Sequence, residues 1–441
     1  MISIGGIIGA GLFVGSSVSI AAIGPAIVVS YLITGTLILL VMRMLGEMAM
    51  SLPTVHSFAD FPRAGLGHWA GFVTGWLYWY FWMIVVPFEA IAGANILQTY
   101  IPLPAGVLGG ILMACMTAVN LMSARSYGEF EFWFSSIKVA AIIAFIALGA
   151  AYAFGWTSPH GATFANLTSH GGFMPYGAVS VLAGAVTVFF QLTGAEIVTV
   201  AAVESAEPAR AVAQLTSSII VRVLTFYVGS IFFIVAIVPW NSIEIGKSPF
   251  THALVQMHFA WAGWAMDFIV LTAVLSCLNS AFYVCSRVLF VLAGHGDAPQ
   301  ALIQLNRRRV PVKSVLLCAL AGIAGILADV AAPQRVFAFL LDSAGALMVF
   351  IYMIVAIAQV RLRRTRERAG APPPALTMWL FPWASYLAIA GMAAVLTAMA
   401  FTPSLTEELK VSLISLAVVV LAYVARRARG RPMSDASASA D

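Results

Sequence analysis

Long apolar segments without charge recur along the chain, and they constrain its fold more than any other feature. Several reach the roughly 18 residues that a helix needs to cross a hydrocarbon core about 30 Å thick. Of the 441 residues, 61% are hydrophobic and 9% are charged, against roughly 25% charged residues in ordinary soluble domains. Because lipid offers the backbone no hydrogen-bond partners, such runs must form helices. The sequence therefore predicts an all-α polytopic membrane protein.

The apolar runs predict twelve transmembrane helices and no separate soluble domain. The stretch GAPPP at 370–374 is a stiff linker, and the small polar residues of 428–441 predict a disordered cytoplasmic tail. The predicted helices span 4–22, 26–50, 69–97, 106–121, 132–154, 178–203, 219–238, 265–292, 314–330, 336–360, 378–401 and 411–424.

The distribution of Lys and Arg predicts the orientation of these helices. If both termini are cytoplasmic, nineteen of the 23 basic residues lie in inside loops, three lie outside and Lys138 lies within a span. This asymmetry follows the positive-inside rule. The basic pI of about 9.1 then reflects loops that face anionic lipid, so no nucleic-acid partner is needed to explain it.

The sequence lacks the motifs of several other functional classes. It has no GxxxxGK[ST] phosphate loop, which argues against ATP-driven pumping by this chain alone. Its four cysteines fall within spans, and its seven histidines are scattered through loops and span ends. No motif supplies a nucleophile with a base and an orienting partner. We therefore expect a protein that is not an enzyme and that holds no metal or cofactor.

Glycines crowd the first span, which begins MISIGGIIGAGLF. They could allow close helix packing, or they could mark an unwound segment whose backbone groups contact a ligand at mid-membrane. Span 6 reads VTVFFQLTGAEIV and has a second Gly-Ala pair in an apolar run, Gly194-Ala195, which matches Gly9-Ala10. Interrupted helices at matching places in two halves are typical of transporters built on inverted repeats. The pair therefore favours the unwound reading.

Several motifs resemble the amino acid transporter family of the amino acid/polyamine/organocation superfamily. They are GGIIGAGLFVGS, MRMLGEMA at 42–49, GWLYWYFW at 75–82, YGEFEFWF at 127–134, AAVESAEPARAV at 201–212 and NSAFYVCSRVLFVLAGHGDAP at 279–299. Within that family, IVVPFEAIAG at 84–93 looks most like bacterial GABA permeases and less like aromatic amino acid permeases. The resemblance implies proton-coupled uptake of an amino acid across the bacterial cytoplasmic (inner) membrane.

The resemblance also implies a domain arrangement. Helices 1–5 (1–155) and 6–10 (178–361) would form a five-plus-five inverted repeat with helices 1 and 6 broken, and helices 11–12 (378–427) would be peripheral. Only eight residues precede Gly9, whereas a basic segment and a full half-helix are implied there. Either the true start lies upstream of Met1, which we expect, or the inner half of helix 1 is missing.

Site residues follow from the same resemblance, position by position. The unwound part of helix 1 would offer its amides to a substrate carboxylate, and Phe190 in helix 6 would be a lid between the pocket and the exterior. Gln191 departs from the small polar residue expected there, which leaves the exact substrate open. The implied substrate-binding residues are Ile8, Gly9, Ala10, Gly11, Phe190, Thr193 and Gly194.

Ionisable residues within the spans are candidates for proton coupling, because a charge at mid-bilayer is costly. Lys138 in span 5 either has such a role or snorkels to the cytoplasmic surface. Glu89 in span 3 either contacts the substrate amine or relays a proton, or it bonds to a neighbouring helix while protonated. We expect Glu196 to fix the break in helix 6 by accepting backbone N–H groups. We expect Asp342 to be exposed at a helix end.

The sequence favours a secondary transporter that imports GABA, or a small neutral amino acid such as proline, by proton symport through alternating access. The predicted partners are thus an amino acid substrate, protons and membrane lipid. A permease for aromatic or other amino acids remains an alternative. A channel or a sensor on the same helical scaffold is a further alternative, although neither requires two helix breaks that close off a site in turn.

Overall fold

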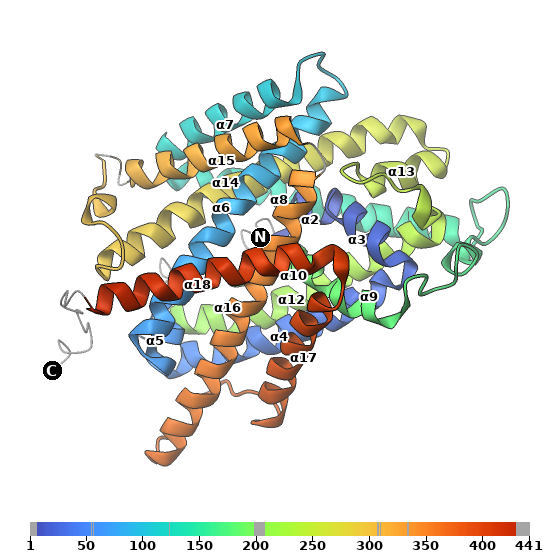
Figure 1. Ribbon diagram of the computed structural model, residues 1–441. Coiled ribbons are helices and arrows are strands. Elements are labelled where there is room, and N and C mark those ends of the chain that lie inside the picture. The colour runs from blue at the N-terminus through green and yellow to red at the C-terminus, as the bar shows by residue number, and fades with distance from the viewer. Residues whose placement is uncertain are drawn as a thin grey trace.

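A computed structural model of the chain describes residues 7–428, except 54, 56, 123, 198–207, 307, 309 and 333–334. The described residues form helices and connecting loops, with no strand among them (Figure 1). The α-helices are α2 (Ala10–Phe13), α3 (Ser16–Ile23), α4 (Ile27–Ser51), α5 (Asp60–Leu66), α6 (His68–Gln98), α7 (Ala105–Met122), α8 (Ala124–Ala153), α9 (Gly177–Ala183), α10 (Ala185–Leu192), α12 (Pro208–Ile237), α13 (Pro249–Gln256), α14 (Ala260–Gly294), α15 (Val312–Ala331), α16 (Arg335–Arg368), α17 (Trp383–Ala400) and α18 (Thr406–Ala428). Short 3₁₀ helices span Gly24–Ala26, Phe164–Leu167, Trp240–Ser242, Gln300–Ile303 and Pro403–Leu405.

The predicted all-helical membrane class is confirmed. Within the described ranges, nine helical segments are long and apolar enough to cross a membrane. The first, Ala10–Ser51, contains the predicted helices 1 and 2. The shorter apolar helices Gly177–Leu192 and Val223–Ile237 lie where helices 6 and 7 were predicted. Every predicted span thus overlaps a helix, while the number of crossings stays a prediction.

The helices at the centre of the molecule are α6 and α16. In each, 72% of the most apolar window is buried inside the protein, whereas the corresponding share is 11% in α18. The helix α6 packs against α7, α14, α15 and α16, and α10 packs against α16 and α4. In Figure 1, α18 crosses in front of the other helices, and α17 lies below it. The described parts of the two broken helices, α2 of helix 1 and α10 of helix 6, therefore pack against longer, continuous helices.

Glycine allows α16 to approach the outer half of helix 6 closely. A Cβ atom at Gly345 would lie 2.0 Å from the carbonyl oxygen of Val186 in α10. Any larger residue at position 345 would push the two backbones apart, which is the reason small residues are common where membrane helices meet. This contact holds α10 in place directly before its break.

An ion-pair cluster ties the last helix to the core at the end predicted to be cytoplasmic. The buried carboxylate of Asp297, in the loop after α14, accepts hydrogen bonds from Arg63 in α5 at 2.6 Å and from Arg426 in α18 at 2.8 Å. The imidazole of His68 at the start of α6 lies 3.1 Å from the same carboxylate. Nearby, burial raises the pKa of Asp60, and His295 and Arg63 oppose that rise.

Candidate substrate site between two broken helices

The first helix is interrupted at Ile8 and Gly9, which are not helical. Gly9 is extended, with φ −134° and ψ −151°, and α2 begins at the next residue. The carbonyl group of Ile7, released by the interruption, accepts a hydrogen bond at 3.0 Å from the hydroxyl of Tyr227 in α12. The predicted break therefore exists, and Tyr227 satisfies one of its freed backbone groups.

Glu89 binds the other side of this break. Its two carboxylate oxygens lie 3.1 and 3.0 Å from the N–H of Ala10, which donates to them. Gly9 lies so close to this carboxylate that a Cβ atom there would be 2.6 Å from Oε1 of Glu89 and 2.6 Å from Cβ of Cys277. Glycine at position 9 is therefore required by space. Glu89 thus bonds to a neighbouring helix at the position where the substrate carboxylate was predicted to bind, and its part in relaying a proton stays a prediction.

The sixth helix is interrupted between Thr193 and Glu196, directly after α10. Gly194 has φ +123°, a left-handed conformation that side chains disfavour. The carboxylate of Glu196 accepts the N–H of Gly194 at 3.1 Å. It also accepts the hydroxyls of Tyr78 at 3.2 Å and Tyr352 at 2.8 Å. The prediction that Glu196 fixes the break is thus confirmed.

The two breaks face one another across a small cavity. A Cβ atom at Gly11 would lie 3.3 Å from the Cα atom of Gln191 and 3.6 Å from the ring of Phe190. The cavity has a volume of about 20 Å³, which is room for roughly one water molecule. An amino acid can enter only if the wall moves. The lining residues are Ile7, Gly11, Phe81, Trp82, Val85, Glu89, Phe190, Gln191, Thr193 and Cys277.

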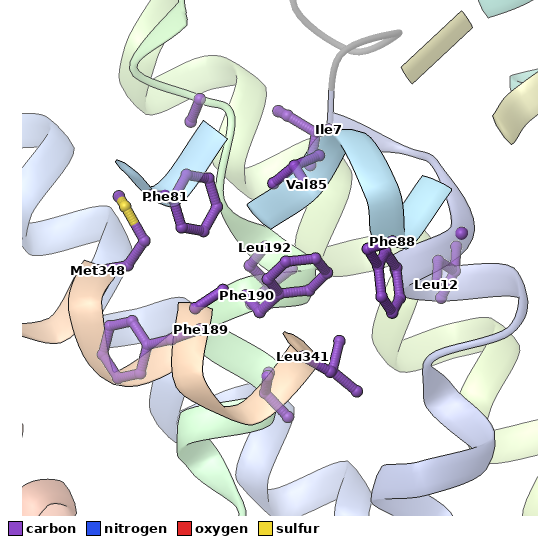
Figure 2. Close-up of a cluster of buried hydrophobic side chains, with 14 of the residues drawn as sticks. Ile7, Leu12, Phe81, Val85, Phe88, Phe189, Phe190, Leu192, Leu341 and Met348 are labelled. Carbon is purple, nitrogen blue, oxygen red and sulfur yellow. The ribbon is translucent and has the colours of Figure 1, made fainter. Parts of the chain in front are cut away.

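Phe190 belongs to a cluster of buried rings beside this cavity. Its ring centroid lies 5.8 Å from that of Phe81 and 4.8 Å from that of Phe88, both on α6 (Figure 2). Phe88 stacks in turn on Phe337 of α16, at 4.5 Å. These are ordinary distances for favourable aromatic pairs. Phe190 is therefore held by rings from α6, and its predicted role as a lid stays a prediction.

The predicted site residues divide into two groups around this cavity. Gly11, Phe190, Thr193 and Glu89 line it. The other predicted substrate-binding residues lie within the two helix breaks or at their ends: Ile8, Gly9, Ala10 and Gly194. Lys138 lies in α8, outside both breaks. Gln191 also lines the cavity but was noted in the sequence only as an unexpected residue, and its polar side chain in an apolar run was the signal that could have identified it.

Lys138 in α8 is completely buried. Its ammonium donates a hydrogen bond at 2.9 Å to the hydroxyl of Ser276 in α14. The snorkelling interpretation is therefore wrong, because that interpretation requires the ammonium to reach the membrane surface. Ser276 precedes Cys277, the residue that packs against Gly9. One turn of α14 thus connects the lysine with the first break.

The prediction that Asp342 is exposed is also wrong. The side chain is 6% exposed and accepts a hydrogen bond at 2.8 Å from the hydroxyl of Thr187 in α10. The helix α16 begins at Arg335, so Asp342 lies almost two turns inside it and faces α10. Asp342 therefore belongs to the contact between α16 and helix 6.

A larger cavity of about 690 Å³ opens between the end of α6 and the segment around α13. Val14, directly after α2, is part of its lining, so the cavity reaches the outer end of α2. Asp267 on its wall accepts hydrogen bonds from Tyr100 at 2.8 Å and from Thr251 at 2.7 Å. Burial and this acceptor raise the pKa of Tyr100 to about 12. If both termini are cytoplasmic, as the charge asymmetry predicts, this cavity is a vestibule that opens to the cell exterior.

Comparisons with known proteins agree with this architecture. The amino acid permease family matches residues 1–428. The gamma-aminobutyric acid permease of Bacillus subtilis is 43% identical over 97% of this chain and 92% of its own length. That of Escherichia coli K12 is 40% identical over 98% and 93%, respectively.

A solved structure shares the fold. The crystal structure of the Eremococcus coleocola manganese transporter, in complex with an aromatic bis-isothiourea substituted compound, superposes with a TM-score of 0.60. It is 11% identical, and the match covers 96% of this chain and 92% of that one. At this identity the likeness concerns the fold alone. The match to the family over nearly the whole chain and the two permease relatives lead to one conclusion: the chain belongs to the amino acid permease family.

Proposed function

We propose that the chain is a secondary transporter that imports GABA, or a small neutral amino acid such as proline, by proton symport. The observation that carries this proposal is the hydrogen bond from Ala10 N–H to Glu89. The amide at the first break binds a carboxylate there, so it can also bind the carboxylate of an amino acid. The similarity to two GABA permeases, at 43% and 40% identity, supports the substrate class.

A zwitterion fits the chemistry of the two breaks. Amide N–H groups at the start of a helical segment attract a carboxylate, and the freed carbonyl groups of helix 6 can accept from an ammonium. The small cavity between Gly11 and Gln191 favours a small substrate, since its wall must move by less to admit one. An aromatic amino acid would require a larger displacement of Phe190 and its partners.

Proton coupling follows from competition for the same amide. A substrate carboxylate that binds Ala10 N–H must displace the carboxylate of Glu89, and two negative charges at one position repel each other. Protonation of Glu89 removes that repulsion, so binding of the substrate and of the proton favour each other. Lys138 reaches the same region through α14. We assign the coupling role to Glu89 and Lys138.

Alternating access would use the two breaks as hinges. The closed cavity favours a transporter over an open channel, because a site that is sealed between states is what alternating access requires. In this proposal the vestibule lies outside and Phe190 moves to admit the substrate. The segments 1–155 and 178–361 form the inverted repeats, both termini are cytoplasmic, and the protein lies in the bacterial inner membrane.

Uptake competition tests the substrate class. The protein is reconstituted in proteoliposomes, and uptake of labelled GABA is measured against an excess of unlabelled GABA, proline, phenylalanine or lysine. We expect GABA and small neutral amino acids to compete and the aromatic and cationic ones not to. Uptake of aromatic amino acids alone would overturn the substrate assignment and leave the fold unaffected.

A further inference from the structure

Gln191 connects three helices at the cavity wall. It belongs to the last turn of α10, and its side chain is 1% exposed. Its carbonyl oxygen accepts a hydrogen bond from the hydroxyl of Tyr31 in α4, and its amide nitrogen donates at 2.8 Å to the hydroxyl of Ser19 in α3. Both ends of the amide are thus fixed by partners from different helices.

The same side chain lies where the two breaks are closest. The point at which a Cβ atom of Gly11 would stand is 3.3 Å from Cα and 3.6 Å from Cγ of Gln191. The stem of the side chain therefore occupies space between helix 1 and helix 6, beside the cavity. To leave that space, the amide must give up two buried hydrogen bonds, and a buried polar group without partners is costly.

Phe190 and Gln191 differ in how they are held. The ring of Phe190 packs against those of Phe81 and Phe88 and carries no hydrogen-bonding group, so it can change rotamer without losing a hydrogen bond. Gln191 is held by direction-specific bonds to Tyr31 and Ser19. The cavity wall at Gln191 is thus more rigid than the wall at Phe190.

We propose that Gln191 determines substrate size at this site: its side chain, clamped by Tyr31 and Ser19, restricts the cavity to short, narrow amino acids and excludes branched and aromatic ones. This inference rests on the proposed transport of amino acids through the cavity between the breaks. It assigns to Gln191 a specificity role beyond the attachment of α10 to its neighbours.

Three variants separate bulk from clamping. Gln191→Ala removes the side chain and both hydrogen bonds. Tyr31→Phe removes one hydrogen bond and leaves the bulk of Gln191 in place. Gln191→Ser keeps a hydroxyl in case the alanine variant does not fold. Gly110→Ala in α7 is the matched control, because a Cβ atom at Gly110 would have no neighbour within 4 Å.

The measurement is a panel of ligands assayed in two ways. Inhibition of uptake by leucine and phenylalanine is compared with inhibition by GABA, and thermal stabilisation of the purified protein by the same compounds is measured without transport, since a ligand that binds the folded state raises Tm. One methylene in a pocket is worth roughly 10- to 200-fold in discrimination. We expect Gln191→Ala and Gln191→Ser to strengthen inhibition by leucine, relative to inhibition by GABA, by about tenfold or more. The gain should be smaller for Tyr31→Phe.

The outcomes are distinct for the two proposals. Unchanged leucine-to-GABA ratios in both Gln191 variants, or an equal loss for all compounds, would overturn the specificity role and leave Gln191 as a structural attachment. If the wild type takes up a different amino acid, that compound replaces GABA as the reference in both assays. If the wild type shows no uptake, the proposed function fails, and the thermal panel still decides whether leucine binds the Gln191 variants better.

Discussion

At the residue scale, the buried charges near the first break carry the energetic coupling in our account. Glu89 and Lys138 are 2% and 0% exposed, and each has a partner on another helix. A charged group buried in this way persists only where its partners compensate the loss of water. A change in the protonation of either group must therefore alter how the helices around the break fit together.

Substitution of Glu89 separates binding from coupling. Glu89→Gln retains the shape of the side chain and an oxygen that can accept from Ala10 N–H, but it cannot exchange a proton. We expect exchange of labelled for unlabelled substrate to continue and accumulation driven by a proton gradient to be lost. Both are measured in the same proteoliposomes. Gradient-driven accumulation at the wild-type level would remove Glu89 from the coupling mechanism.

Substitution of Lys138 tests the other half of that assignment. Lys138→Ala removes the contact with Ser276, and Lys138→Arg keeps a charge that cannot be released. We expect both variants to insert in the membrane and to lose gradient-driven uptake, with an accumulation ratio that falls to about one. Ser136→Ala, on the exposed side of the same helix, is the control. Normal accumulation in both Lys138 variants would leave Glu89 as the only coupling residue.

The sequence predicted individual residues best where chemistry alone limits the choices. The cost of charge in lipid argued against a freely snorkelling Lys138, which is buried, while its part in proton coupling stays a prediction. The bond of Glu196 to the helix 6 backbone was predicted from its place beside the break. The partners of Gln191 could not be predicted, because Tyr31 and Ser19 come from two other helices and meet it only in the folded protein. Asp342 was misjudged because hydropathy does not show which side of a helix faces a neighbour.

At the element scale, the interruptions of helices 1 and 6 are the features that make a site. Gly-Ala pairs and the resemblance predicted both interruptions at the positions where the structure has them. The short helices α5 and α13 were not predicted, because they lie outside the long apolar runs. The ends of α12 and α16 extend beyond the predicted spans, to Pro208 and Arg368, since a helix can continue where its residues are no longer apolar.

A side chain added at the first break should block transport. Gly9→Ala would place a Cβ atom 2.6 Å from the Glu89 carboxylate, and Gly11→Val would place one 3.3 Å from the backbone of Gln191. Overpacking costs about 1–3 kcal/mol, and about 1.4 kcal/mol corresponds to a tenfold change. We expect uptake per molecule of inserted protein to fall by about 5- to 140-fold in both variants, and Gly110→Ala to match the wild type. Full uptake by Gly11→Val would contradict an unwound site.

At the scale of the whole molecule, orientation and direction of transport depend on the charge asymmetry. The vestibule near Val14 must face the periplasm if import begins there, and the cluster around Asp297 must face the cytoplasm. Both assignments follow if the nineteen basic residues of the inside loops are cytoplasmic.

Reporter fusions test this orientation directly. Alkaline phosphatase is active only in the periplasm. Green fluorescent protein fluoresces only in the cytoplasm, because it does not fluoresce after export in an unfolded state. We expect cytoplasmic signals after Arg368 and after Arg427, and a periplasmic signal near His160 in the loop after α8. A cytoplasmic signal near His160 would show that the predicted order of spans is wrong.

The claim at the centre of this account is that a proton gradient drives an amino acid through the site between the two breaks. The most direct measurement is accumulation of labelled GABA in proteoliposomes under an imposed inward proton gradient, compared with an imposed sodium gradient and with no gradient. We predict accumulation above the external concentration only with the proton gradient, and its loss when an uncoupler is added. Equal GABA entry under all three conditions, or accumulation only with sodium, would contradict the account.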